Sequence, residues 1–153
     1  MSNIIDFSLS ELVSNIKNKK ISSKEATSAY VERSKKSKSL NAYNEETFDT
    51  ALKKATNFDS KPDFNKKLPG VPIAVKDLFC TKNVKTTASS KILNNFIPTY
   101  ESTVTQNLWN NGSILLGKLN CDEFAMGSSN ETSYFGNVIS PIDKDLVPGG
   151  SSG

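Results

Sequence analysis

A lysine inside an apolar strand is the residue whose setting points most directly to chemistry. The segment Leu68 to Leu78 reads as an apolar strand entered through a Pro-Gly turn. Strand alternation places Ala74 and Lys76 on one face, so the side chain of Asp77 should leave the other face. Lys76 must therefore pair elsewhere, reach solvent or lose its proton. Two interpretations stay open: a strand-end lysine that extends to water, or a neutral lysine that acts as a general base.

The second feature is a loop of glycine and serine at Pro148 to Gly153, which contains Ser151 and Ser152. Consecutive glycines permit backbone conformations that bring hydroxyl and N–H groups close to a ligand. Such loops are also common as linkers. A phosphate-binding P-loop needs a Gly-x-x-x-x-Gly-Lys-Ser/Thr pattern, which the sequence lacks.

The chain has no histidine, and this limits the catalytic arrangements that it can contain. Neither a Ser-His-Asp nor a Cys-His arrangement can exist, so a hydroxyl nucleophile would need lysine as its base. Cys80 and Cys121 are too few for a disulfide framework, and without histidine they cannot complete a typical zinc site. We therefore expect no metal and no cofactor in this chain.

A short segment from Asp122 to Glu131 combines carboxylates, hydroxyls and a glycine. Asp122 and Glu123 are adjacent and should diverge, which argues against a paired-carboxylate acid/base site. One interpretation is a capped turn with Phe124 and Met126 packed inward. The other is the wall of a substrate pocket, for which the candidates are Met126, Gly127 and Ser128.

The elements that position these residues follow from hydrophobic periodicity and capping patterns. We place a helix where a capping-box sequence or apolar residues at helical spacing begin, and a strand where a short apolar run occurs. The expected helices span residues 8–19, 22–38, 48–55 and 103–111, and the expected strands span residues 40–43, 68–78 and 113–119.

This alternation predicts an α/β fold with a helical N-terminal layer, followed by strands of a mixed sheet covered by helices. We divide the chain into an N-terminal helical region, residues 1–67, and the start of a core, residues 68–153. The chain stops inside a glycine-rich loop, an unusual place for a domain to finish. We therefore expect a single incomplete domain, truncated at its C-terminal end.

Composition favours an ordinary globular protein: 36% of residues are hydrophobic, 23% are charged and the net charge is +3. The N-terminus carries Asp6 and Glu11 and shows no targeting segment, so we expect a cytoplasmic protein, or one in an organelle matrix after import. Arg33 is the single arginine, which argues against a site dedicated to recognising phosphate groups or nucleic-acid bases. The basic residues from Arg33 to Lys38 suit a solvated helix end, or alternatively an RNA contact.

Taken together, these segments resemble the amidase signature family. The stretch Pro69 to Asp77 is similar to its strand with the catalytic lysine, and Pro148 to Gly153 is similar to the start of its Gly-Gly-Ser-Ser-Gly-Gly loop. The resemblance implies that Lys76 is the base and that Ser151 relays a proton between this lysine and the nucleophile. It also implies a cis peptide bond before Ser151 and a supporting role for Ser152.

The segment Asp122 to Glu131 and the residues before it follow one branch of the family, the glutamine-hydrolysing subunits of tRNA-dependent amidotransferases. That branch implies glutamine as substrate, partner subunits in a heterotrimer, and ATP and magnesium used by a partner subunit on aminoacyl-tRNA. The family's acyl-forming serine lies beyond Gly153, so we expect these residues alone to be inactive. The alternatives are a stand-alone amidase for another amide, or a non-catalytic interaction module.

Overall fold

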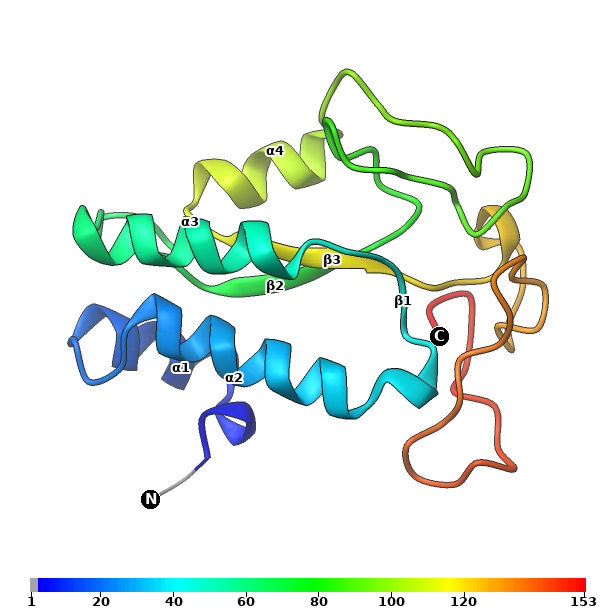
Figure 1. The fold of residues 1–153 in the computed structure, drawn as a ribbon, viewed down its shortest axis with the longest axis horizontal. Helices are drawn as coiled ribbons and strands as arrows, with labels where there is room; N and C mark the ends of the chain where they lie inside the picture. The colour runs from blue at the N-terminus through cyan, green and yellow to red at the C-terminus, as the bar shows by residue number, and fades with distance from the viewer. Residues whose placement is uncertain (1–2) are drawn as a thin grey trace. The chain divides into compact units, whose positions relative to one another are not determined.

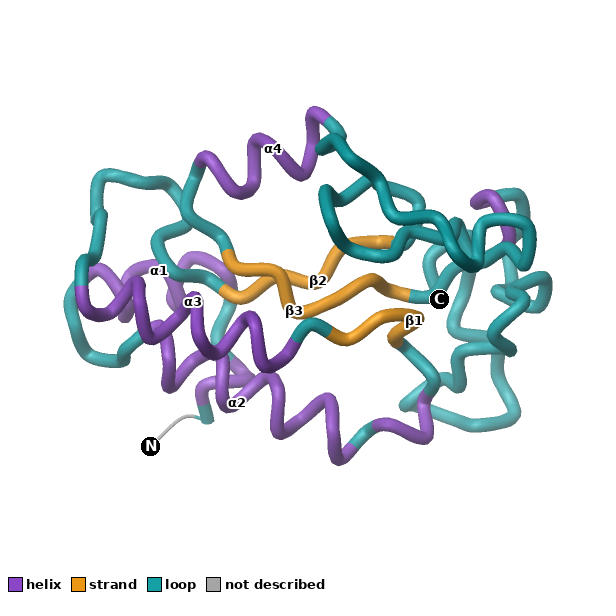
Figure 2. The backbone as a smooth tube through the Cα atoms, turned by 45° about the horizontal axis from the view of Figure 1, so that its top comes forward, coloured by secondary structure: helices purple, strands orange, loops and turns teal. Residues whose placement is uncertain are grey.

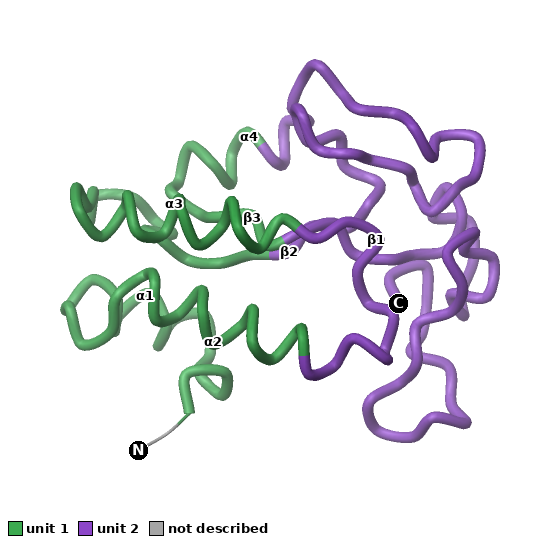
Figure 3. Tube along the Cα trace, viewed as in Figure 1, with its two compact units in different colours: residues 1–35, 47–73, 106–116 green, residues 36–46, 74–105, 117–153 purple. Residues whose placement is uncertain are grey.

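The computed structural model describes residues 3–153, which form helices, a small sheet and long irregular segments (Figure 1). The chain divides into two compact units that are interleaved in sequence (Figure 3). Unit 1 comprises residues 1–35, 47–73 and 106–116, and unit 2 comprises residues 36–46, 74–105 and 117–153. Each unit therefore draws on both sides of the boundary expected at residue 67.

The main elements are four helices and three strands among the described residues. The helices are α1 (Leu9–Lys17), α2 (Ser23–Lys36), α3 (Phe48–Ser60) and α4 (Thr103–Asn110); the strands are β1 (Tyr43–Glu46), β2 (Pro72–Lys76) and β3 (Ile114–Leu119). Single-turn 3₁₀ helices occur at Ile4–Asp6, Lys38–Leu40 and Glu123–Ala125. None of the helices in residues 3–153 is both long enough and apolar enough to cross a membrane.

The first two helices begin at the capping boxes that the sequence predicts. The Ser8 hydroxyl accepts a hydrogen bond from the Glu11 N–H, and the Glu11 carboxylate accepts one from the Ser8 N–H. Ser22 and Glu25 repeat the arrangement at α2. These pairs satisfy amide groups that a helix start otherwise leaves unpaired.

Unit 1 has an apolar core made by α1, α2 and the residues that lead into β2. Leu12, Ile16, Ala26 and Val71 are its buried centre. The turn before β2 is held by Gly70, whose φ of +66° suits glycine and whose carbonyl accepts a hydrogen bond from the Ser23 hydroxyl at 2.6 Å. The predicted strand from residue 68 therefore begins only at Pro72, because residues 68–70 form this turn.

The sheet has the order β1-β3-β2, with β3 in the middle (Figure 2). β1 pairs with β3 in the antiparallel sense, with Glu46 opposite Gly117. β2 runs parallel to β3: the Ile114 N–H donates to the Val71 carbonyl, and the Asp77 N–H donates to the Leu119 carbonyl. The expected mixed sheet in an α/β fold is therefore confirmed.

One strand is displaced from its predicted place. The strand expected at residues 40–43 is instead β1 at Tyr43–Glu46, since the chain first forms a 3₁₀ turn and then a left-handed residue, Asn41, with φ of 55°. The Asn41 amide donates to the carbonyls of Phe135, Gly136 and Asn137. An extended strand across Asn41 would break these contacts, which side-chain patterning does not reveal.

Candidate active site

Lys76 is the last residue of β2, and its side chain meets Ser151. The Lys76 Nζ donates a hydrogen bond to the Ser151 Oγ at 2.5 Å, although 75 residues separate them in sequence. The Lys76 and Ser151 side chains are both half-buried. The lysine therefore pairs with a hydroxyl group, rather than ending in water or with its neighbour Asp77.

The loop that carries Ser151 is fixed by its backbone. The peptide bond between Gly150 and Ser151 is cis, as the resemblance led us to expect. The Asp122 N–H donates to the Ser151 carbonyl at 2.9 Å, and Ser152 forms an isolated antiparallel bridge with Cys121. The Ser152 residue itself is exposed, so its expected supporting role stays a prediction.

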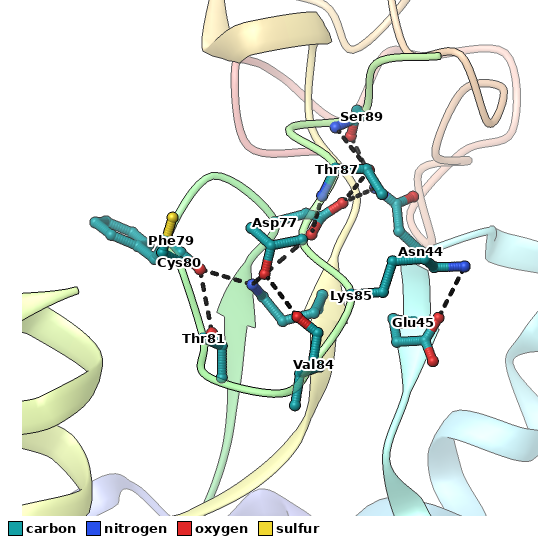
Figure 4. A network of polar contacts seen from close by, with 12 residues as sticks. Asn44, Glu45, Asp77, Phe79, Cys80, Thr81, Val84, Lys85, Thr87 and Ser89 are labelled. Carbon is teal, nitrogen blue, oxygen red and sulfur yellow. Dashed lines mark hydrogen bonds and ion pairs between the residues drawn. The ribbon is translucent and has the colours of Figure 1, made fainter. Parts of the chain in front are cut away.

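Asp77 is fully buried and belongs to a network of polar contacts (Figure 4). Its carboxylate accepts hydrogen bonds from the Thr87 N–H at 3.1 Å, the Thr87 hydroxyl at 2.5 Å and the Asn44 amide at 2.9 Å. The Lys118 Nζ lies 3.7 Å from it and completes an ion pair in which both side chains are fully buried. Strand alternation thus places Lys76 and Asp77 in different environments.

Lys118 joins β3 to the loop that follows β2. Its Nζ donates to the Phe79 carbonyl at 2.7 Å and to the Thr86 hydroxyl at 2.8 Å. Burial lowers the pKa of Lys118 to about 8, even though the neighbouring Asp77 carboxylate acts in the opposite direction. The ion pair and two hydrogen bonds offset only part of the cost of burying the charge.

Ser89 connects this network to Cys121, which forms the isolated β-bridge with Ser152. Its hydroxyl accepts hydrogen bonds from the Asn44 amide at 2.8 Å and from the Cys121 N–H at 3.1 Å. Burial raises the pKa of the Cys121 thiol, although the contact with Ser89 opposes this. A protonated, fully buried thiol is a poor nucleophile, so Cys121 has a structural role.

The segment proposed as a pocket wall lies at the surface. Met126, Gly127 and Ser128 are all exposed, and Met126 keeps 75% of its accessible area. The alternative of inward-packed side chains is wrong, because Phe124 is also exposed and takes a left-handed conformation with φ of 52°. Asp122 and Asn130 are the buried residues of the segment, and the Asp122 carboxylate accepts hydrogen bonds from the Asn130 N–H and the Thr132 hydroxyl.

The arrangement is suited to proton transfer between an amine and a hydroxyl group. Within residues 3–153, no three histidine, cysteine or acidic side chains gather closely enough to hold a metal ion. A lysine amine 2.5 Å from a serine oxygen can take a proton from it, or return one.

Comparison with known proteins identifies the family of the chain. The family profile described as Amidase matches residues 25–153. The chain belongs to the amidase signature family. The glutamyl-tRNA(Gln) amidotransferase A subunit from Pelagibacter ubique is 74% identical over all 153 residues, and its counterpart from Rickettsia bellii is 52% identical over a 160-residue alignment. A solved structure of fatty acid amide hydrolase superposes with a TM-score of 0.89 at 25% identity, covering 97% of this chain and 27% of that one.

Both amidotransferase matches span 100% of this chain but only 32% of the length of the relatives. The family profile covers the segment that contains Lys76 and Ser151. The buried pair of Asp77 and Lys118 was not anticipated from the sequence. A lysine within the apolar run Ile114 to Leu119 was the available signal, because such a residue must have a buried partner.

Proposed function

We propose that this chain supplies the lysine base and the bridging serine of a glutamine-hydrolysing amidase. The observation that carries the proposal is the 2.5 Å contact between Lys76 Nζ and Ser151 Oγ. The contact joins the two residues that the amidase signature resemblance assigns to proton transfer. The high identity to the amidotransferase relatives supports glutamine as the substrate class.

In the proposed reaction, Lys76 takes a proton from Ser151 as Ser151 takes one from the acyl-forming serine. The resemblance places that serine in a segment that follows the glycine-serine loop. Its oxygen attacks the side-chain amide carbon of glutamine, the C–N bond breaks, and the returned proton leaves with ammonia. Water then hydrolyses the glutamyl ester to glutamate by the same proton path. Residues 1–153 alone should therefore be unable to hydrolyse amides.

The wider assembly belongs to the same proposal. Ammonia passes to a partner subunit, which uses ATP and magnesium to convert Glu-tRNA(Gln) or Asp-tRNA(Asn) to the amidated form. We place the assembly, a heterotrimer, in the cytoplasm or an organelle matrix. Met126, Gly127 and Ser128 are proposed to line the glutamine pocket, and their exposure leaves them free to contact a substrate. Ser152 is proposed to support the site through hydrogen bonds.

The test measures ammonia release from glutamine by the full-length gene product, purified with its partner subunits. Lys76→Ala and Ser151→Ala should each lower kcat by about 10²- to 10⁴-fold, which is the usual contribution of a positioned proton-transfer group. Lys82→Ala is the matched control, because Lys82 is exposed, and its activity should stay at the wild-type level.

Two outcomes separate this proposal from its alternatives. Hydrolysis of another amide, with no response to partner subunits or tRNA, would indicate a stand-alone amidase. Full activity in both Lys76→Ala and Ser151→Ala would exclude the catalytic assignment and favour a non-catalytic interaction module.

A further inference from the structure

The Asp122 side chain lies against the segment that carries Ser151. It is fully buried, and its carboxylate accepts hydrogen bonds from the Asn130 N–H at 3.0 Å, the Thr132 N–H at 3.3 Å and the Thr132 hydroxyl at 2.9 Å. Burial alone would raise the pKa of Asp122, but these hydrogen bonds outweigh it and hold the pKa below its ordinary value. The carboxylate is therefore ionised at neutral pH and closes the turn from 127 to 132.

Two glycines pack directly on this carboxylate. A Cβ atom on Gly127 would lie 2.3 Å from Asp122 Cγ. A Cβ atom on Gly150 would lie 2.5 Å from Asp122 Oδ2 and 2.3 Å from the carbonyl carbon of Ser128. Both distances are far inside van der Waals contact, so only glycine lets the backbone come this close. The carboxylate and the turn that it closes thus form a seat for Gly150.

The residues after Gly150 are held in the same way. The backbone N–H of Asp122 donates to the Ser151 carbonyl at 2.9 Å. A Cβ atom on Gly153 would lie 2.6 Å from Cγ of Asn130, which is fully buried and accepts a hydrogen bond from the Val138 N–H. Ser151 is therefore placed between two glycines, each of which packs on a buried polar side chain.

We propose that Asp122 is a positioning residue for Ser151: its carboxylate orders the turn at 127–132 and seats Gly150, which keeps Ser151 Oγ beside Lys76 Nζ. The inference rests on the proposed function, because that function gives Ser151 its role in proton transfer. Positioning has large kinetic effects, since a displacement of about 1 Å can lower the rate by about 100-fold.

The experiment compares Asp122→Asn with wild type in the full-length enzyme with its partners. Asparagine keeps the shape but replaces one acceptor oxygen with an NH₂ group that faces N–H donors. The kcat for ammonia release should fall about 10- to 100-fold while KM stays within about threefold, as expected when only the placement of a reacting group changes. Asp145→Asn is the control, because Asp145 is exposed, and its kcat should not change.

A second variant covers the case in which Asp122→Asn does not fold. Gly150→Ala keeps the Asp122 carboxylate in the sequence but adds a methyl group where only glycine fits, so Gly150 must move away from Asp122 and Ser128. It should lower kcat at least as much as Asp122→Asn, and its melting temperature, although reduced by the clash, shows whether the variant is folded at the assay temperature. Wild-type kcat in a folded Gly150→Ala variant would overturn the proposal.

The double variant Asp122→Asn/Ser151→Ala separates positioning from a merely structural role. If Asp122 acts through Ser151, the double variant should be no slower than Ser151→Ala alone, within about twofold, because residues that act as a unit are not additive. Multiplied losses would mean that Asp122 acts elsewhere, which would overturn the inference. Full activity of Ser151→Ala would instead overturn the proposed function. If the enzyme prefers another amide, the same comparisons apply with that amide.

Discussion

Replacing Lys118 with methionine tests the buried ion pair beneath the site. Methionine retains most of the apolar stem and removes the charged group that contacts Asp77, Phe79 and Thr86. Asp77 would stay buried with its hydrogen bonds from Thr87 and Asn44 but without a counter-charge. Removing one partner of a buried pair typically costs about 3–5 kcal/mol of unfolding free energy. We expect a loss of about 3 kcal/mol, near the lower limit, because those hydrogen bonds remain.

The assay is urea denaturation of the full-length protein, followed by circular dichroism. Because the slope increases with protein size beyond the about 1–3 kcal/mol per molar urea of small proteins, the expected loss lowers the midpoint by up to about 1 M. Lys85→Met is the matched control, because Lys85 pairs with Glu45 at 3.0 Å and both side chains are about one third exposed. Pairs exposed in this way contribute only about 0–1 kcal/mol.

A double variant identifies the source of the loss. Asp77→Asn removes the carboxylate charge, and the Asn44 amide can turn to receive the new NH₂ group, because its Oδ1 is buried without a hydrogen-bond partner among the described residues. Asp77→Asn/Lys118→Met should therefore be more stable than Lys118→Met alone. The reasoning is refuted if Lys118→Met is as mild as Lys85→Met, or if neutralising Asp77 recovers no stability.

Two further predictions concern pH and helix capping. The pKa of Lys118 falls from 10.5 to about 8 on folding, so the unfolded state binds more protons between these values. Stability should rise from pH 8 towards pH 10.5, by an amount on the order of 3 kcal/mol, because the neutral amine no longer carries the cost of charge burial but keeps its hydrogen bonds to Phe79 and Thr86, which methionine lacks. Urea midpoints of Lys118→Met should lack this rise. At α1, Ser8→Ala removes the hydroxyl that accepts from Glu11, which should cost about 1 kcal/mol by urea denaturation. Ser10→Ala, within the same helix and exposed, should change stability by less than about 0.5 kcal/mol; equal losses would contradict the capping argument.

Sequence patterns predicted those parts of the fold that local interactions determine. The helices α1 and α2 begin where capping boxes place them, because the hydrogen bonds span only three residues. The bounds of strand β3 were predicted to within one residue, since a short apolar run of this kind is typical of a buried strand. The expected position of β1 was wrong, because Asn41 binds carbonyls about 95 residues away.

The two residues of the candidate site could be predicted from the sequence, but the residues that hold them in place could not. Lys76 and Ser151 were identified through the resemblance, and the structure places them in contact. The role of Asp122 could not be read from the sequence, because it depends on two glycines that pack on one carboxylate from opposite ends of the segment 127–150. Likewise, the partner of Lys118 lies 41 residues earlier, at the end of another strand.

Lys76 and Lys118 show how strand geometry separates a lysine that we propose for proton transfer from a structural one. Both belong to neighbouring strands of one sheet, but their partners differ: a serine hydroxyl for Lys76, and a carboxylate with a backbone carbonyl for Lys118. A carboxylate favours the charged amine, whereas a hydroxyl group can exchange a proton with it. Because Asp77 directly follows Lys76 at the end of β2, its carboxylate points to the opposite side. The same alternation therefore gives Lys118 its counter-charge and leaves Lys76 to Ser151.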